Sequence, residues 1–339
     1  MDQTGETSNR RVAGKPRVIV TRHLLPSIET RMEELFDARL NADDAPLSRE
    51  ALIAAMNDCD VLVPTVTDRI DADLIAQAGD RLGLIASFGA GTDHIDLAAA
   101  AKRKIMVTNT PGVFTDDTAD LTMALIIGVP RRLREGTALI RREAWTGWAP
   151  SAMLGHKLGG KVLGIVGMGR IGQAVAYRAR AFGLEIRYHN RHPLPQAVEA
   201  MFGAQYVEKL DDLVAQSDIL TLHCPATADT RGLIDTRRIG LMKPGATLVN
   251  TARADLVDYD AMIEALESGH LGGAGLDVFP EEPKVDARLV ALSNVIAQPH
   301  IGSATVEGRE ASGEKVIANI RFWADGHRPP DQVLEALVR

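Results

Sequence analysis

Short apolar runs alternate along most of the chain with stretches that have apolar residues at helical spacing. A first series predicts strands at 17–21, 61–64, 84–87 and 106–109 and helices at 28–36, 49–56, 71–78 and 97–102. A second series begins at Lys161 and predicts strands at 162–166, 185–189, 219–223, 246–250, 275–278 and 295–297. Apolar strands separated by helices are typical of parallel sheets with helices on both faces. The pattern therefore predicts an α/β fold.

The segment between the two series predicts a connecting helix. A Thr-Pro-Gly turn at 110–112 precedes Thr115 and Asp116, either of which can cap a helix with apolar positions at Leu121 and Leu125. Pro130 lies within the apolar pattern and should kink or end this helix.

The two ends of the chain differ in character. Residues 1–15 are polar and predict a disordered tail, whereas residues 304–324 predict one more helix. We expect one domain formed by residues 16–109 with 305–339 and a second domain formed by residues 110–304.

The composition excludes several classes of protein. Of the 339 residues, 45% are hydrophobic and 24% are charged, as in ordinary globular domains. Acidic residues outnumber basic ones by 45 to 38, a net charge of −7 that disfavours binding to nucleic acid. No apolar stretch has the roughly 20 residues of a membrane helix, and the polar N-terminus lacks the apolar region of a secretory signal. We expect a cytoplasmic protein with neither a nucleic-acid nor a membrane partner.

Cysteine and histidine spacing gives no metal site. Cys59 and Cys224 are too few for a disulfide framework or a multi-cysteine site. No His/Asp cluster has the spacing of metal ligands, so we expect no bound metal.

Residues 167–172, GMGRIG, form a G-x-G-x-x-G motif whose context makes it informative. The motif alone is weak because glycines are common in turns, but a predicted strand precedes it and a predicted helix follows it. Gly167 can make the tight turn, Gly169 can let the backbone approach a pyrophosphate, and Gly172 can let the helix pack on the strand. A purely structural strand–turn–helix is the alternative.

The next predicted strand ends in the segment that should read the cofactor ribose. Asn190 lies 18 residues beyond Gly172, close to the ~20 expected for an acidic residue that selects NAD. Because Asn190 is uncharged and Arg191 and His192 follow it, the segment favours a 2′-phosphate and therefore NADP, with NAD as a second cofactor. A solvated polar turn before Pro193 is the alternative.

Three polar residues follow later strands, at the end where parallel sheets bind ligands. They are Arg253 in NTARAD, Glu282 in DVFPEEP and His300 in QPHIGS. Each alone could be structural: a surface charge, a turn residue and a packed histidine.

Taken together and in this order, these features resemble the D-isomer-specific 2-hydroxyacid dehydrogenases. The resemblance extends from about Arg17 to Gly326 and includes the loop at 88–96 (FGAGTDHID) and the segment at 222–225 (LHCP). Residues 111–120 and the Tyr-His-Asn-Arg strand end look more narrowly like the glyoxylate/hydroxypyruvate reductase branch. One departure is Ala254, where the family usually has glycine, so that a turn requiring positive φ would be strained here.

The resemblance implies a fold and an assignment of roles. The fold would be a Rossmann-type doubly wound parallel sheet in a dinucleotide-binding domain, residues 110–304. A discontinuous flavodoxin-like outer domain, residues 16–109 with 305–339, would be the substrate domain. Arg253 would bind the substrate carboxylate and keto oxygen through its forked guanidinium. His300 would be the acid/base, and Glu282 would hold its ring and favour the protonated form.

The remaining residues implied by the family bind substrate or cofactor. The backbone N–H groups of Ala90 and Gly91 would take the substrate carboxylate. The cofactor-binding residues would be Thr118, Gly167, Gly169, Arg170, Ile171, Gly172, Asn190, Arg191, Cys224, Thr251 and Asp277. A helix cap for Thr118 and core packing for Cys224 and Thr251 are the alternatives.

Trp145 and Trp148 lie in a segment that helps form a subunit interface in related reductases and can reach the neighbouring active site. Core packing is the alternative for both side chains. We expect a homodimer.

The expected activity is hydride transfer between NAD(P)H and a small 2-keto acid, with glyoxylate and hydroxypyruvate, and hence D-glycerate, as leading substrates. Two alternatives remain open: a dinucleotide-sensing regulatory protein on the same scaffold, and a reductase of larger 2-keto acids. Oxidation of formate or phosphite is a further alternative, although the glutamine expected for formate is not in its place, since Gln298 adjoins Pro299 and His300.

Overall fold

The computed structural model describes residues 14–334, which form two compact units. Unit 1 contains residues 14–114 and 305–334, and unit 2 contains residues 115–304. Most of the predicted disordered tail, residues 1–13, lies outside the described residues. No helix in the described part of the chain is both long and apolar enough to span a membrane.

Unit 1 is built on a five-stranded parallel sheet. Its strand order is β2-β1-β3-β4-β5, the flavodoxin-like order. The strands are β1 (Arg17–Val20), β2 (Asp37–Arg39), β3 (Val61–Val63), β4 (Leu84–Ala86) and β5 (Met106–Thr108).

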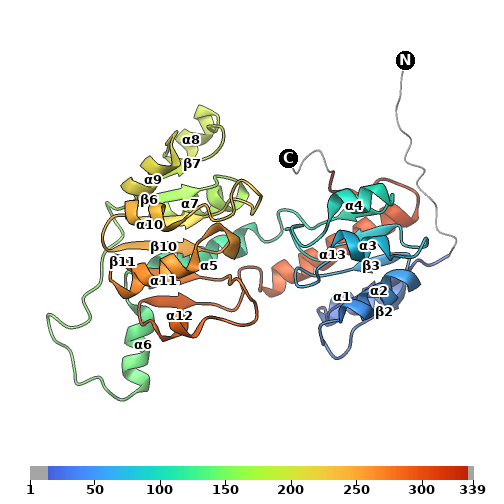
Figure 1. The fold of residues 1–339 in the computed structure, drawn as a ribbon, viewed down its shortest axis with the longest axis horizontal. Helices are drawn as coiled ribbons and strands as arrows, with labels where there is room; N and C mark the ends of the chain where they lie inside the picture. The colour runs from blue at the N-terminus through green and yellow to red at the C-terminus, as the bar shows by residue number, and fades with distance from the viewer. Residues whose placement is uncertain (1–13, 335–339) are drawn as a thin grey trace. The chain divides into compact units, whose positions relative to one another are not determined.

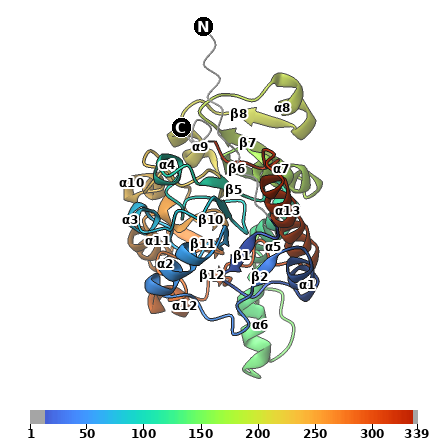
Figure 2. The same cartoon turned by 90° about the vertical axis from the view of Figure 1, so that its right-hand side faces the viewer.

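Helices cover both faces of this sheet (Figure 2). On one face lie α1 (Pro26–Leu35) and α13 (Val306–Ala324), and on the other α2 (Arg49–Asp58), α3 (Ala72–Ala76) and α4 (Leu97–Lys102). A Cβ on Gly313 would lie 2.5 Å from Ile28, so glycine allows α13 to pack closely against α1. The C-terminal helix therefore completes the core of the N-terminal sheet.

Unit 2 is built on a seven-stranded parallel sheet with the order β12-β11-β10-β9-β6-β7-β8. From β8 to β11 this is the doubly wound order, with its switch point between β6 and β9. Figure 1 labels β6, β7, β10 and β11 of this sheet. The strands are β6 (Val162–Val166), β7 (Glu185–His189), β8 (Ala204–Tyr206), β9 (Ile219–Leu222), β10 (Ala246–Asn250), β11 (Leu271–Leu276) and β12 (Val295–Ala297).

Separate apolar cores cover the two faces of this sheet. One core includes residues of α5 (Thr115–Gly128), α7 (Arg170–Ala181) and α8 (Gln196–Phe202). The other includes residues of α9 (Leu210–Gln216), α10 (Thr236–Leu241), α11 (Tyr259–Glu267) and α12 (Ala287–Ala291). The expected α/β fold with two parallel sheets is confirmed.

Several boundaries differ from the predictions for physical reasons. Helix α5 ends at Gly128, before Pro130, as predicted, but a further helix, α6 (Leu133–Arg141), follows. Strand β11 begins four residues earlier than predicted because Gly272 and Gly273 hide its pattern. A Cβ on Gly275 would lie 2.8 Å from the Leu125 Cβ, so glycine there lets α5 pack directly on the sheet.

Candidate active site

The glycine loop of unit 2 has the shape that a dinucleotide phosphate requires. Gly167 follows β6 with a φ of 97°, and a Cβ there would lie 2.5 Å from the backbone nitrogen of Cys224. A Cβ on Gly172 would lie 2.3 Å from the carbonyl oxygen of Gly167, whereas one on Gly169 would meet no atom within 4 Å. The outer glycines are needed for packing, and Gly169 leaves its backbone open to a ligand.

The N-terminus of α7 adds an anion-binding end to this loop. Gly169 is its N-cap, and no side chain accepts hydrogen bonds from the first turn. Arg170 is exposed at the first helical position, with half-buried Ile171 beside it. Uncapped N–H groups and the helix dipole favour phosphate, so these residues fit the pyrophosphate of a dinucleotide.

Asn190, at the end of β7, contacts the glycine loop directly. Its Oδ1 accepts a hydrogen bond from the Met168 N–H at 2.7 Å, and its carbonyl accepts one from the Tyr206 hydroxyl at 3.2 Å. Arg191 and His192 are exposed beside it. Asn190 therefore holds the loop, and two side chains capable of positive charge lie next to it.

Arg253 is held by a buried asparagine that sequence reasoning missed. Asn250, at the end of β10, donates from Nδ2 to the Arg253 carbonyl at 2.8 Å and accepts from the Ala252 N–H at 3.0 Å. Ala254 opens the short 3₁₀ turn η1 (Ala254–Leu256) and has no positive φ. The departure from glycine at this position therefore causes no strain.

His300 and Glu282 form a hydrogen-bonded pair on two loops at the same edge of the sheet. His300 Nδ1 lies 2.8 Å from Glu282 Oε2, and Glu282 Oε1 accepts the Phe279 N–H at 2.9 Å. Burial raises the pKa of Glu282, but the hydrogen bonds from His300 and Phe279 and the charges of His300 and Arg253 outweigh it and lower the pKa overall. With Nδ1 engaged by a carboxylate, Nε2 is the nitrogen that can exchange a proton with a substrate.

The other predicted cofactor residues lie near these loops but have partners within the chain. The Thr118 hydroxyl donates to the Gly302 carbonyl at 3.1 Å, and the Thr251 hydroxyl lies 2.8 Å from that of Thr122. Burial raises the pKa of the Cys224 thiol to about 11, so it is not a nucleophile at neutral pH. Asp277 is 1% exposed and accepts two backbone hydrogen bonds, from Ile301 and Gly302.

His223 is a further polar residue of this edge that the sequence did not single out. Its Nε2 lies 2.9 Å from the Thr221 hydroxyl, and burial lowers the pKa of its imidazole to about 3. His223 is therefore neutral at physiological pH. Within the described residues, no group of three or more His, Cys, Asp or Glu side chains is arranged to hold a metal ion.

Ala90 and Gly91 lie in unit 1, in the loop that follows β4. Asn109 donates to the Ala90 carbonyl at 2.7 Å, and Thr110 N–H donates to the Gly89 carbonyl at 2.9 Å. The N–H groups of Ala90 and Gly91 donate no hydrogen bond within residues 14–334. Both remain available as donors to an anion.

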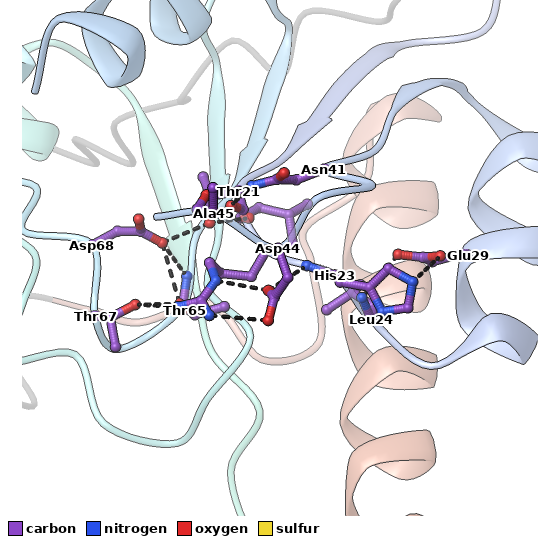
Figure 3. Close-up of polar contacts among 12 residues, drawn as sticks. Thr21, His23, Leu24, Glu29, Asn41, Asp44, Ala45, Thr65, Thr67 and Asp68 are labelled. Carbon is purple, nitrogen blue, oxygen red and sulfur yellow. Dashed lines mark hydrogen bonds and ion pairs between the residues drawn. The ribbon is translucent and has the colours of Figure 1, made fainter. Parts of the chain in front are cut away.

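In unit 1, a polar network lies at the carboxyl ends of β1, β2 and β3 (Figure 3). Asp68, buried, accepts from the Thr21 hydroxyl at 2.6 Å and the Thr65 N–H at 2.8 Å. Arg22 pairs with Asp44, which lowers the pKa of that carboxyl. These groups bind one another, so the network stabilises the loops.

Arg309, in the first turn of α13, is a second residue that the sequence did not single out. Its guanidinium lies 6.0 Å from the Phe88 ring centroid and 5.9 Å from that of Phe114. Burial lowers its pKa, and aromatic faces stabilise a cation in such surroundings. Phe88, Phe114 and Arg309 are far apart in the sequence, so no local pattern predicts their contact.

Trp145 and Trp148 are 61% and 85% exposed, which excludes the core-packing alternative. They follow α6, none of whose residues is buried, although its sequence is strongly amphipathic. This segment, residues 133–154, carries further exposed apolar side chains at Leu133, Ile140, Met153 and Leu154. We call it the exposed apolar segment.

The chain is similar to known proteins over most of its length. Residues 123–302 match the model of the NAD-binding domain of D-isomer specific 2-hydroxyacid dehydrogenases. A glyoxylate reductase of Thermococcus litoralis is 44% identical over 94% of this chain and 97% of its own.

Solved structures show the same similarity. A glyoxylate reductase from Paecilomyes thermophila is 33% identical, with a TM-score of 0.85 over 96% of this chain and 100% of the other. An NADPH-dependent glyoxylate/hydroxypyruvate reductase from Sinorhizobium meliloti is 30% identical, with a TM-score of 0.83 over 95% and 98% of the two chains. With the glycine loop, Arg253 and the Glu282–His300 pair at one sheet edge, the chain belongs to the D-isomer specific 2-hydroxyacid dehydrogenase family, a family of NAD(P)-dependent oxidoreductases.

Proposed function

We propose that this protein is a glyoxylate reductase that also reduces hydroxypyruvate to D-glycerate. The observation that carries the proposal is the 2.8 Å contact between His300 Nδ1 and Glu282 Oε2, at the sheet edge that also bears Arg253 and the glycine loop. The naming of the Thermococcus litoralis and Paecilomyes thermophila relatives as glyoxylate reductases supports the choice of substrate.

Substrate binding uses the charge and the amide groups of this chain. Arg253 binds the carboxylate and the keto oxygen of the 2-keto acid through two N–H groups of its planar guanidinium. The N–H groups of Ala90 and Gly91, which have no acceptor within the described residues, bind the carboxylate. Asn250 binds the Arg253 carbonyl and thereby fixes the position of the backbone from which the guanidinium extends.

Proton transfer uses His300. When bound, the nicotinamide supplies a hydride to the keto carbon. His300 donates its Nε2 proton to the keto oxygen as negative charge develops there, while Glu282 holds Nδ1–H and stabilises the imidazolium before transfer. In the reverse direction, His300 Nε2 accepts the hydroxyl proton of a D-2-hydroxy acid.

The cofactor preference of the proposed enzyme is for NADPH. Residues 189–192 contain no carboxylate that would repel a 2′-phosphate, and exposed Arg191 can bind one. A charge-assisted hydrogen bond of about 1.5 to 3 kcal/mol corresponds to roughly a ten- to hundredfold preference.

A paired variant tests this preference. Asn190→Asp with Arg191→Ala keeps an acceptor for the Met168 N–H while adding a negative charge, and it should swing the kcat/KM ratio toward NADH. Arg231→Ala, at another exposed arginine, is the control and should keep the original ratio. A wild-type preference of about tenfold or more for NADH would contradict the proposal.

The exposed apolar segment supports a homodimer. A helix with an amphipathic sequence and no buried residue, followed by two exposed tryptophans, is an apolar surface that a second copy would cover. Sedimentation equilibrium should give twice the monomer mass for the wild type and the monomer mass for Trp148→Glu. A monomeric wild type would contradict the dimer without affecting the proposed reaction.

One panel of assays tests the activity itself. NADPH and NADH are each measured against glyoxylate, hydroxypyruvate, pyruvate and phenylpyruvate. Glyoxylate with NADPH should give the highest kcat/KM, with hydroxypyruvate next. Phenylpyruvate as the best substrate would contradict the proposal, as would the absence of turnover with any of the four. We place the enzyme in the cytoplasm, where reduced nicotinamide cofactors are regenerated.

A further inference from the structure

The backbone of the loop that carries His300 has an unfavourable conformation, which contacts with neighbouring residues must stabilise. His300 has a φ of 54°, in the left-handed region that non-glycine residues rarely adopt. Its own side chain is tied to Glu282 through Nδ1. A single bond to the ring does not fix the backbone, so other contacts must maintain this conformation.

The next peptide groups are held on one side by a buried carboxylate. Asp277 Oδ1 accepts the Ile301 N–H at 2.8 Å, and Oδ2 accepts the Gly302 N–H at 2.7 Å. Asp277 follows β11 and has its own N–H bonded to the Asn250 carbonyl at 3.0 Å. Both oxygens of a rigidly placed side chain therefore bind the two residues that follow His300.

A hydroxyl on α5 holds the same segment from its other side. Buried Thr118 donates from Oγ1 to the Gly302 carbonyl at 3.1 Å. Gly302 thus has its N–H bound by Asp277 and its carbonyl bound by Thr118. A Cβ on Gly302 would lie 2.9 Å from Asp277 Oδ2 and 3.5 Å from Thr118 Cγ2, so only glycine fits between them.

We propose that Thr118 and Asp277 are positioning residues for His300: by holding the Gly302 peptide at both ends, they keep the imidazole where Nδ1 meets Glu282 and Nε2 faces the substrate. This inference rests on the proposed function and differs from the cofactor contacts that family resemblance implies for both residues. A carboxylate oxygen accepts more than one hydrogen bond, so Asp277 can also contact a cofactor. The tests therefore use Thr118 and Gly302.

Two Thr118 variants separate the hydroxyl from the volume of the side chain. Thr118→Val removes the donor at nearly constant size and should lower kcat for glyoxylate about tenfold, with the NADPH Kd within about twofold. Thr118→Ser restores a donor and should recover most of that loss. Thr247→Val, a buried threonine at the opposite end of β10 whose hydroxyl makes no side-chain hydrogen bond, is the matched control.

Gly302→Ala tests the hydrogen bonds of Asp277 and Thr118 to Gly302 without removing any polar group. Its methyl would be forced against Asp277 Oδ2, so kcat should fall by at least about tenfold. In the apoenzyme, amide hydrogen exchange of a peptide covering residues 299–303 should accelerate in Gly302→Ala and Thr118→Val and not in Thr247→Val. This readout needs neither cofactor nor turnover.

A double mutant distinguishes positioning from general damage. In a His300→Ala background no imidazole remains to be positioned, so adding Thr118→Val should leave the residual turnover unchanged. A further tenfold loss there would overturn the inference, as would a Thr118→Val enzyme with normal kcat and weakened NADPH binding. Absence of glyoxylate turnover in the wild type would instead overturn the proposed function, and the exchange measurement would still decide the positioning role.

Discussion

The carboxyl ends of β1, β2 and β3 in unit 1 and the carboxyl edge of the unit 2 sheet are built in different ways. In unit 1, the polar groups around Thr21 and Asp68 bind one another, and Arg22 is paired with Asp44 (Figure 3). In unit 2, His300 has a positive φ and an imidazole nitrogen directed away from its carboxylate partner. The part of the unit 1 edge at β1, β2 and β3 thus serves local stability, whereas the edge of unit 2 carries the proposed acid/base pair.

This difference predicts which property each edge controls. Removing a group from the unit 1 network should cost stability, because its partners lose hydrogen bonds in a buried setting. Removing a group from the unit 2 edge should cost turnover, because its partners hold reactive atoms in place. Variants of the two edges should therefore separate the free energy of unfolding from kcat.

The largest effect should come from His300→Ala. Loss of a general acid should lower kcat for glyoxylate reduction by about 10²- to 10⁴-fold. Binding of NADPH, followed by fluorescence, should survive, as should the midpoint of urea unfolding. Near-normal turnover would show that the proton comes from elsewhere.

Arg253→Lys should have the next largest effect. A lysine ammonium keeps the charge but cannot reproduce the planar fork, so kcat/KM for glyoxylate should fall about ten- to a hundredfold. Arg231→Lys, on the surface and 75% exposed, serves as the control. An unchanged kcat/KM for Arg253→Lys would reduce Arg253 to a surface charge.

Asp68→Ala should lower stability and leave turnover largely unchanged, the opposite of the variants in unit 2. Its carboxylate accepts hydrogen bonds from Thr21 and Thr65, so the free energy of unfolding should fall by about 1.5 to 3 kcal/mol in urea titrations. Asp43→Ala, at an exposed neighbouring carboxylate, should change it little. A large fall in kcat with an unchanged free energy of unfolding for Asp68→Ala would contradict the proposed difference between the two edges.

Glu282→Gln should give the smallest and most specific effect, a shift in pH dependence. The pKa of Glu282 is lowered, so the pair is complete above pH 4.5, the ordinary value for glutamate, and is lost only as pH falls through the lowered pKa. At neutral pH the Glu282 carboxylate is ionised and contacts the His300 ring. Glutamine carries no charge, so the alkaline limb of the reduction profile should move to lower pH. An unmoved limb would contradict the pairing.

The sequence predicted most of the buried fold and little of its edges. Strands β6, β10 and β12 have their predicted bounds because they consist mostly of apolar residues, and β7 because its buried Ile186 and Tyr188 alternate with polar residues. Strands β2 and β8 were missed because both lie at sheet edges and carry exposed polar residues. Helix α6 was missed, although its sequence is amphipathic, because Pro130 was interpreted as the end of the helical pattern.

The candidate site was predictable where a single side chain carries the proposed role, and less so where several residues act through the backbone. Arg253, Glu282 and His300 were predicted as catalytic residues from their motifs and the family resemblance, and the structure brings Glu282 and His300 into contact. The bonds from Asn250 to the Arg253 turn, and from Thr118 to Gly302, join backbone groups whose approach depends on tertiary packing. No spacing in the sequence encodes such contacts.

The configuration of the glycerate formed from hydroxypyruvate and NADPH tests the proposed chemistry most directly. With Arg253 holding the carboxylate and His300 delivering the proton from a fixed side, the hydride can reach one face of the carbonyl carbon. Chiral chromatography of the product should therefore show D-glycerate alone. A racemic product would contradict a substrate held in one orientation by Arg253 and His300, and L-glycerate would contradict the proposed D-specific reduction.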